Sequence, residues 1–129
     1  MRILVVDDDL ISQKLLNVIL TDFGTVEVAD NGEKAIELVK KSFIQKNYYN
    51  IVFLDIMMPG MDGHETLREL RKLEEQEGIQ LGNGMKIAMV TALGNKDNVL
   101  SAFSEGCEHY IVKPVQQEKI KALMADLRS

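Results

Sequence analysis

Short runs of apolar residues alternate along the chain with longer segments in which apolar positions recur every three or four residues. The short runs are typical of strands buried on both faces, and the periodic segments are typical of amphipathic helices. We expect strands at about Ile3–Val6, Val26–Ala29, Ile51–Asp55, Lys86–Thr91 and Tyr110–Val112. We expect helices at about Leu10–Phe23, Glu33–Phe43, His64–Glu75, Lys96–Glu105 and Gln117–Leu127.

This alternation predicts an α/β fold. Strands that are joined by helices run parallel and cross over with a right hand, so the helices cover both faces of one sheet. The chain shows no internal repeat and no linker. We therefore expect residues 1–129 to form one domain.

Three helices carry further detail. The first has apolar positions that repeat at helical spacing, and we expect Gly24 to end it: Ile11, Leu15, Val18 and Ile19. The last has an apolar face made by Ile120, Leu123, Met124 and Leu127. The third is expected to end in a solvated acidic segment: Glu74, Glu75 and Glu77.

Composition narrows the class of protein. With 46% hydrophobic and 27% charged residues, the chain has the composition of a soluble globular domain. Its net charge of −5 argues against a nucleic-acid surface, which needs clustered Lys and Arg. The single Cys107 excludes an internal disulfide. There is neither a signal-peptide pattern nor an apolar run long enough to cross a membrane, so we expect a cytoplasmic protein.

Polar residues directly follow four of the predicted strands. Asp7 and Asp8 follow the first strand, Asp55 ends the third, Thr91 ends the fourth and Lys113 follows the fifth. The carboxyl ends of parallel strands share one edge of a sheet, which is where open α/β sheets bind ligands. Asp55 could instead cap the next helix, but a turn rich in Pro and Gly comes before that helix.

Three carboxylates gathered at one edge predict a cation. A pair of like charges 4 Å apart costs roughly 4 kcal/mol at an effective dielectric of 20. Oxygen ligands favour Mg²⁺ over zinc or copper, and protein-bound Mg²⁺ commonly reaches out to phosphate. Lys113 and the Thr91 hydroxyl suit phosphoryl oxygens, and Asp55 could act as a nucleophile that forms an acyl phosphate.

Four segments resemble, in order and spacing, the motifs of the receiver domain of bacterial response regulators, including the single-domain chemotaxis regulators. They are Val5-Val6-Asp7-Asp8, the run from Leu54 to Gly63, Val90-Thr91-Ala92 and the run from Tyr110 to Pro114. The resemblance implies a flavodoxin-like sheet with strand order 2-1-3-4-5. It also implies a signalling module of a two-component system, not an enzyme, which takes phosphate onto Asp55 from a histidine kinase or a histidine phosphotransfer protein.

The resemblance also assigns roles. Asp8 and Asp55 would bind Mg²⁺ directly, Asp7 would act mainly through water, and the Met57 carbonyl would complete the protein's ligands. Lys113 and Thr91 would contact the phosphoryl group. Thr91 and Tyr110 would switch together and alter the surface made by the fourth helix, fifth strand and fifth helix. A cis peptide between Lys113 and Pro114 is implied as well.

Other side chains carry smaller expectations. Met57 and Leu93 stand where receivers face the approach of water to the acyl phosphate, and both are apolar, so we expect slow self-dephosphorylation. Cys107 is expected to be buried and inert. His64 and His109 are expected at the surface rather than as phosphate carriers.

Two other classes share some of these features. Asp7-x-Asp9 after a buried strand also resembles the start of a Mg²⁺-dependent aspartyl phosphatase of the haloacid dehalogenase type, with Asp7 as the nucleophile. That assignment leaves the turn after Asp55 unexplained. A flavin-binding flavodoxin shares the expected fold, but this chain lacks a Ser/Thr-rich phosphate loop, and a colourless protein would exclude it.

Overall fold

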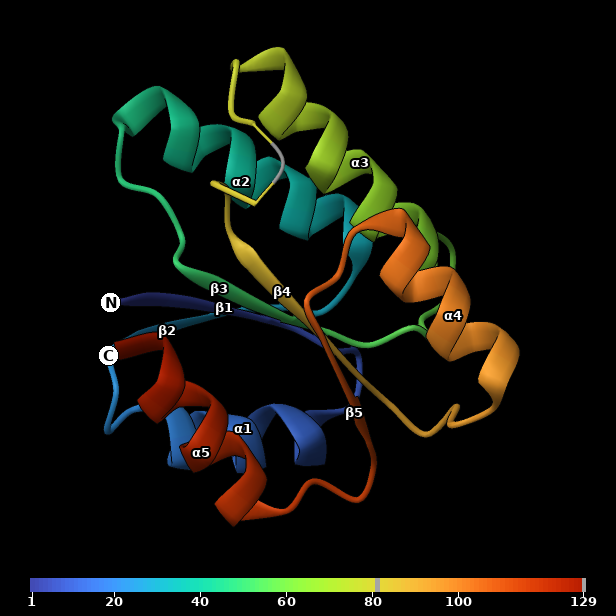
Figure 1. Cartoon of the computed structure of the whole chain (residues 1–129). Coiled ribbons are helices and arrows are strands. Elements are labelled where there is room, and N and C mark those ends of the chain that lie inside the picture. The colour runs from blue at the N-terminus through green and yellow to red at the C-terminus, as the bar shows by residue number, and fades with distance from the viewer. Residues whose placement is uncertain (81, 129) are drawn as a thin grey trace.

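A computed structural model describes residues 1–80 and 82–128, in which five parallel strands form one sheet with helices on both faces (Figure 1). The strands are β1 (Arg2–Val6), β2 (Thr25–Ala29), β3 (Ile51–Leu54), β4 (Lys86–Thr91) and β5 (His109–Val112). The helices are α1 (Leu10–Leu20), α2 (Gly32–Gln45), α3 (Gly63–Gln76), α4 (Lys96–Glu105) and α5 (Gln117–Arg128). The strand order is β2-β1-β3-β4-β5, so the predicted fold class and topology are confirmed.

The sheet separates two apolar cores. Successive side chains of a strand point to opposite faces, so residues of even and odd number go to different cores. Even-numbered residues of β1 and β3 pack with α2, α3 and α4, together with two odd-numbered residues of β4: Leu4, Val6, Val52, Leu54, Ile87 and Met89. Odd-numbered residues of β1 and β3 pack with α1 and α5, together with two even-numbered residues of β4: Ile3, Val5, Ile51, Phe53, Ala88 and Val90. Figure 1 shows these two helical layers on either side of the sheet. Burial on both faces explains why the strands read as continuous apolar runs.

In β4 the odd-numbered residues, and not the even-numbered ones, face the core under α2, α3 and α4. Leu54 of β3 pairs with Met89 of β4, and both contribute to the core under α2, α3 and α4. Phe53 pairs with Ala88, and both contribute to the core under α1 and α5. Paired residues therefore face the same layer, as the pleat requires.

The predicted bounds of β4 and α4 agree with the structure, whereas α1 is shorter than predicted. It ends at Leu20 with Thr21 as its cap, and Phe23 lies in the following turn. Gly24 does not cap the helix. A Cβ at Gly24 would lie 2.1 Å from the carbonyl oxygen of Met1, so glycine is needed where the chain passes the start of β1.

The helical periodicity of α1 did not identify its buried face. Among Ile11, Leu15, Val18 and Ile19, only Ile19 is buried, and it lies beside Leu16 and Leu20. Ile11, Leu15 and Val18 are 77%, 44% and 70% exposed. The helix has a second apolar side that no described residue covers. In α5 the predicted face is confirmed, because Ile120 and Met124 are buried and Leu123 and Leu127 pack beside them.

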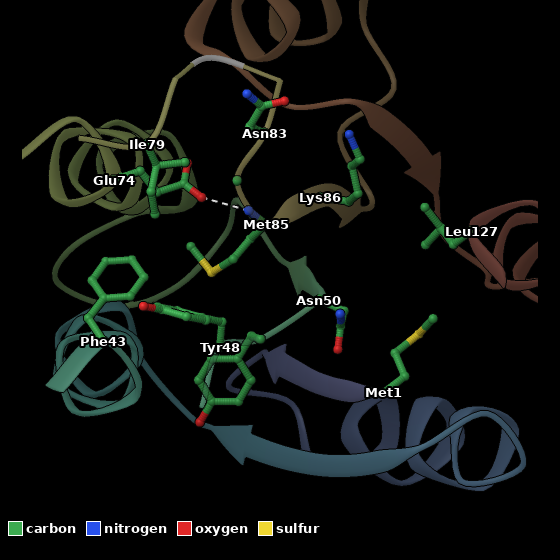
Figure 2. Close-up of a pocket in the computed structure, with 12 residues that line it drawn as sticks. Met1, Phe43, Tyr48, Asn50, Glu74, Ile79, Asn83, Met85, Lys86 and Leu127 are labelled. Carbon is green, nitrogen blue, oxygen red and sulfur yellow. Dashed lines mark hydrogen bonds between the residues drawn. The ribbon is translucent and has the colours of Figure 1, made fainter. Parts of the chain in front are cut away.

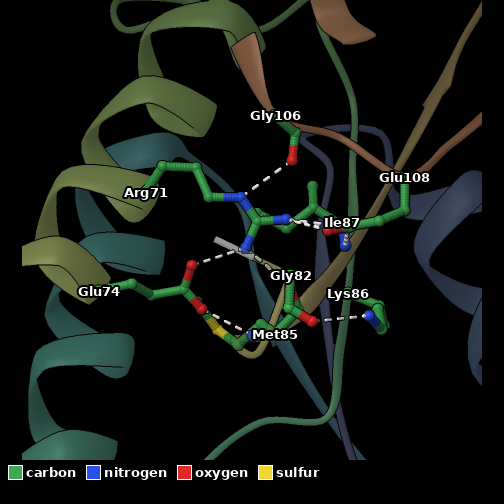
Figure 3. Close-up of polar contacts among 8 residues, drawn as sticks. All are labelled: Arg71, Glu74, Gly82, Met85, Lys86, Ile87, Gly106 and Glu108. Atoms are coloured by element: carbon green, nitrogen blue, oxygen red, sulfur yellow. Dashed lines mark hydrogen bonds and ion pairs between the residues drawn. The ribbon is translucent and has the colours of Figure 1, made fainter. Parts of the chain in front are cut away.

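At the end of α3, Glu75 and Glu77 are exposed as expected, but Glu74 is not. Glu74 is only 5% exposed, and its carboxylate accepts hydrogen bonds from Arg71 Nη1 at 2.6 Å and from the backbone amide of Met85 at 2.6 Å. Figure 3 shows the Arg71 guanidinium at the centre of this cluster, where it also contacts Gly106 O and the Glu108 carboxylate. The cluster joins α3 to the start of β4 and to the segment before β5.

Cys107 lies in the core under α2, α3 and α4, as expected. Burial raises the pKa of its thiol to about 11, so the reactive thiolate is scarce at neutral pH. No helix within the described ranges has the length and apolar character needed to cross a membrane.

Candidate functional site

The sheet brings the predicted polar residues to one edge. Asp7 directly follows β1 and Asp55 directly follows β3, and the backbone amide of Asp55 donates to Val6 O at 2.9 Å. Thr91 is the last residue of β4, and its carbonyl accepts the backbone amide of Lys113 at 2.8 Å. Parallel pairing therefore continues one residue past the strands and sets the spacing of these side chains.

The carboxylates of Asp7, Asp8 and Asp55 form one cluster. One oxygen from each lies within 4.8 Å of the others. Asp7 and Asp55 are 1% and 6% exposed, whereas Asp8 is exposed, and no hydrogen-bond partner for its carboxylate occurs among residues 1–80 and 82–128. Three carboxylates, of which Asp8 is open to solvent, provide the oxygen ligands that suit a hard divalent cation such as Mg²⁺.

Lys113 reaches the two buried carboxylates. Its ammonium nitrogen lies 2.9 Å from Asp7 Oδ2 and 3.1 Å from Asp55 Oδ2. Burial alone would lower the pKa of Lys113, but its hydrogen bonds to Asp7 and Asp55 outweigh that effect and raise the pKa. The pKa of Asp7 is raised because burial outweighs its hydrogen bonds from Lys113 and Asp9, and the charge of Asp55 acts in the same direction as burial.

Two residues that support Asp7 were not identified from the sequence. The backbone amide of Asp9 donates to Asp7 Oδ1 at 2.9 Å, and Gln13 Nε2 donates to the Asp7 carbonyl at 2.5 Å. The Asp9 side chain also caps α1 by accepting from the amide of Ile11 at 3.1 Å. An Asp just before a helix is a recognised capping signal and could have identified this residue.

Both oxygens of Asp7 are therefore occupied. Oδ1 accepts from Asp9 and Oδ2 accepts from Lys113. Asp8, in contrast, points to solvent at the same edge. This difference is consistent with a cation that binds Asp8 directly and reaches Asp7 through water.

Thr91 and Tyr110 are linked through the loop after β4. The Thr91 hydroxyl oxygen accepts the backbone amide of Leu93 at 3.3 Å, and the Tyr110 hydroxyl donates to the Leu93 carbonyl. Tyr110 packs against the core under α2, α3 and α4, so its ring lies inward, and burial raises the pKa of its hydroxyl. The peptide between Lys113 and Pro114 is cis, as predicted.

Met57 and Leu93 lie on the two loops that flank Asp55. The amide of Met57 donates to Asp55 Oδ1 at 3.2 Å, while the Met57 side chain is 57% exposed. Both residues line a hollow of about 470 Å³, together with His64 and Asn98. His64 is not the surface residue that was expected, since its side chain is only 14% exposed and contacts α4.

A separate cleft of about 520 Å³ lies at the other end of the sheet. Its lining includes Asn50, just before β3, and Lys86, the first residue of β4. Aromatic rings of Phe43 and Tyr48, 5.7 Å apart, form part of the wall, and Figure 2 shows them with Met85. The cleft is remote from the carboxyl ends of the strands and takes no part in the site.

Comparison of the sequence with known proteins finds a matching family and several similar relatives. Residues 3–125 match the family described as response regulator receiver domain. Chemotaxis protein CheY of Treponema pallidum is 32% identical over 126 residues, which cover 98% of this chain and 81% of that protein. The probable transcriptional regulator ycf27 of Porphyra purpurea is 34% identical over 122 residues, covering 94% of this chain. The match covers only 44% of ycf27, so this chain spans less than half the length of that relative.

A solved structure agrees with these relatives. The chain of the CheX-CheY-BeF3-Mg complex from Borrelia burgdorferi that matches is 27% identical, with a TM-score of 0.84. The alignment covers 100% of this chain and 90% of the other. That complex contains Mg²⁺ and BeF3.

Proposed function

This chain belongs to the response regulator receiver family, and on that premise we propose that it accepts a phosphoryl group on Asp55 in a Mg²⁺-dependent reaction. Members of the family are signalling modules rather than conventional enzymes. The observation that carries the proposal is the position of Lys113, within hydrogen-bond distance of Asp55 and Asp7 and beside the exposed Asp8. We also propose that residues 1–129 act as one receiver domain in the cytoplasm.

In this proposal Asp8, Asp55 and the Met57 carbonyl would hold Mg²⁺, and Asp7 would hold it through water. The bound cation would supply positive charge between the carboxylates and the phosphoryl oxygens. Both carboxylate oxygens of Asp7 already accept hydrogen bonds, whereas the carboxylate of Asp8 is free within the described part of the chain. This difference supports direct binding by Asp8 and binding through water by Asp7. Mutual repulsion of the three carboxylates favours any cation that enters the cluster.

Asp55 would act as the nucleophile. A carboxylate oxygen attacks phosphorus, the bond from phosphorus to a nitrogen of the donor histidine breaks, and the histidine leaves as an acyl phosphate forms. Lys113 would move from Asp55 Oδ2 to a phosphoryl oxygen. Thr91 would donate its hydroxyl proton to another phosphoryl oxygen, which its bond from the backbone amide of Leu93 permits, because there the hydroxyl oxygen is the acceptor.

The exposed side of α1 would receive the phosphodonor, a histidine kinase or a histidine phosphotransfer protein. Ile11, Leu15 and Val18 form an apolar stripe on this helix, which starts two residues after Asp8. A donor histidine that reaches Asp55 must cover the surface beside the carboxylates, and an apolar stripe there provides binding area. The double variant Ile11→Ser/Val18→Ser is expected to slow transfer from a phosphorylated histidine protein while leaving labelling by acetyl phosphate unchanged.

A matched control comes from α4. Leu100 is exposed and apolar like the residues of the stripe, but it lies on another helix. Leu100→Ser should leave transfer from the donor protein at the wild-type rate. Equal transfer to the wild type and to the α1 double variant would show that the donor binds elsewhere.

The phosphoacceptor role is tested by labelling with acetyl phosphate in the presence of Mg²⁺. The wild type should be labelled, while Asp55→Asn and wild type in excess chelator should not. Asp30→Asn, which removes an exposed carboxylate after β2, is the control and should be labelled normally. Full labelling of Asp55→Asn would contradict the proposal, and loss of label in Asp7→Asn alone would instead favour the phosphatase-like assignment of Asp7.

A further inference from the structure

His64, the second residue of α3, connects this helix to α4 through both ring nitrogens. Nδ1 lies 2.5 Å from Glu105 Oε1, and Nε2 lies 3.1 Å from Asn98 Oδ1. Both partners present acceptor oxygens, so a ring nitrogen that carries a proton can donate to the oxygen beside it. The histidine is thus a polar bridge between α3 and α4.

The contact with Asn98 acts on the first turns of α4. Asn98 Nδ2 donates to Asn95 Oδ1 at 2.5 Å, which leaves Asn98 Oδ1 directed at His64. Asn95 is the N-cap residue of α4, and its side chain makes no capping hydrogen bond to the helix. His64 is therefore linked, through Asn98, to the residue at which the loop carrying Leu93 enters α4.

The other side of the bridge is fixed to the Asp55 loop. The amide of Gly63, the residue before His64, donates to Ile56 O at 2.9 Å. A Cβ at Gly63 would lie 2.3 Å from the Asp55 carbonyl oxygen, so the start of α3 packs directly on the backbone of Asp55. His64 is consequently held in place relative to Asp55.

The bridge forms part of the wall of a hollow next to the loop that follows Asp55. Met57 enters this hollow from the loop after β3, Leu93 enters it from the loop after β4, and His64 and Asn98 complete the wall. Within residues 1–80 and 82–128, the polar contact from α3 to the first turns of α4 is the one made by His64. Arg68 also pairs with Glu105, but this contact is at the last turn of α4.

We infer that His64 is a positioning residue that holds the Leu93 loop against the Met57 loop and so limits the access of water to the acyl phosphate on Asp55. The inference rests on the proposed function. In the hydrolysis that it limits, a water oxygen attacks phosphorus and the bond from phosphorus to the Asp55 oxygen breaks. The carboxylate is regenerated, orthophosphate leaves and the water proton passes to solvent. When the contacts of His64 are lost, the side chains of Met57 and Leu93 separate. Water can then approach in line with the bond from phosphorus to the Asp55 oxygen.

The test compares loss of phosphate from four proteins labelled with radioactive acetyl phosphate, freed of the donor and kept at one Mg²⁺ concentration and pH. Relative to the wild type, His64→Ala and Asn98→Ala should lose phosphate about three- to tenfold faster, the range expected for removal of one coupling contact. Arg68→Ala, which removes the contact at the far end of α4, should match the wild type. The double variant His64→Ala/Asn98→Ala should be no faster than His64→Ala, because both changes break the same bridge.

A second measurement separates positioning from a general effect on the fold. In a Met57→Asn/Leu93→Glu background the apolar side chains that the bridge holds are gone, so adding His64→Ala should change the rate no further. A merely structural role would accelerate hydrolysis in both backgrounds. If His64→Ala does not fold, Asn98→Ala gives the same comparison from a partly exposed position on α4.

The outcomes for the two proposals are distinct. Failure of the wild type to take up phosphate, or labelling of Asp55→Asn, would overturn the proposed function. Normal labelling at Asp55 with wild-type rates of loss in both His64→Ala and Asn98→Ala would overturn the role of His64 alone. Faster loss in Arg68→Ala to the same extent would also overturn it, because any loosening of α4 would then suffice.

Discussion

The ammonium nitrogen of Lys113 lies 3.1 Å from Oδ2 of Asp55, although 58 residues separate the two in the chain. The contact compensates part of the negative charge that β1 and β3 bring together. Lys113→Met should therefore destabilise the metal-free protein by about 1–3 kcal/mol, since it leaves buried carboxylates without their cation. Chemical denaturation in the presence of a chelator measures this, and added Mg²⁺ should restore part of the loss. Lys119→Met, on the exposed side of α5, is the control, and equal stability of both variants would contradict the expectation.

Asp7→Asn should have the opposite effect on the metal-free protein. Burial raises the pKa of Asp7, so the folded state holds a proton more tightly than the unfolded state does. Stability then falls as pH rises from the ordinary value of 3.8 through the raised value, and the loss persists at neutral pH. Removing the charge should stabilise the protein at pH 7 by about 0.5–1 kcal/mol.

Mg²⁺ should raise the unfolding temperature of the wild type and raise that of Asp7→Asn by less, because Asp7 is proposed to hold the cation only through water. Thermal unfolding with and without Mg²⁺ gives both comparisons. An Asn variant that is less stable than the wild type in chelator would show that the hydrogen bonds of Asp7 outweigh its burial and its repulsion from Asp55.

Replacing the apolar side chains that flank Asp55 should shorten the life of the acyl phosphate. Met57→Asn and Leu93→Glu together introduce groups that can orient water, in place of side chains that displace it. We expect phosphate loss to be about tenfold faster at fixed Mg²⁺ and pH, less than the roughly 10²–10⁴-fold that a positioned general acid or base contributes. A rate no higher than that of the wild type would show that the apolar pair does not control the lifetime.

Phosphorylation should alter α4 and β5 more than the opposite edge of the sheet. Thr91, Tyr110 and Lys113 belong to or adjoin these elements, and Leu93 binds two of the three. Hydrogen exchange with and without beryllofluoride should therefore change most in 91–112 and least in 26–43. A uniform change across both regions would count against this expectation.

Arg71→Lys should lower stability without affecting labelling of Asp55. Arg71 donates from Nε to Gly106 O at 2.9 Å and from Nη1 to Met85 O at 2.8 Å, besides its contacts with Glu74 and Glu108. A lysine ammonium cannot reproduce this planar arrangement of donors. We expect a loss of about 2–3 kcal/mol, because buried acceptors are left unpaired. Arg68→Lys, at a more exposed pair, should cost little.

The sheet topology and the residues at its edge could be predicted because they depend on local features. Buried strands are continuous apolar runs, and Asp7, Asp55 and Lys113 follow them directly in the chain. The buried role of Glu74 and the bridge made by His64 could not be predicted in this way. Glu74 is held by Arg71 and by the amide of Met85, and His64 by Glu105, 41 residues away. Helical periodicity does not show such contacts and classifies charged residues as exposed. The buried face of α1 was predicted wrongly for a different reason. This helix carries apolar residues on two sides, and periodicity alone does not show which side packs against the sheet.

The division of the apolar interior by the sheet has a consequence for how such a protein can diverge. The helix proposed to meet the phosphodonor, α1, packs into one core, and α4, which we expect to respond to phosphorylation, packs into the other. Substitutions that reshape the packing beneath α1 are separated by a layer of strands from those that reshape the packing beneath α4. Recognition of a new donor and acquisition of a new downstream target can therefore proceed by independent sets of mutations, with the carboxylate edge between them left unchanged.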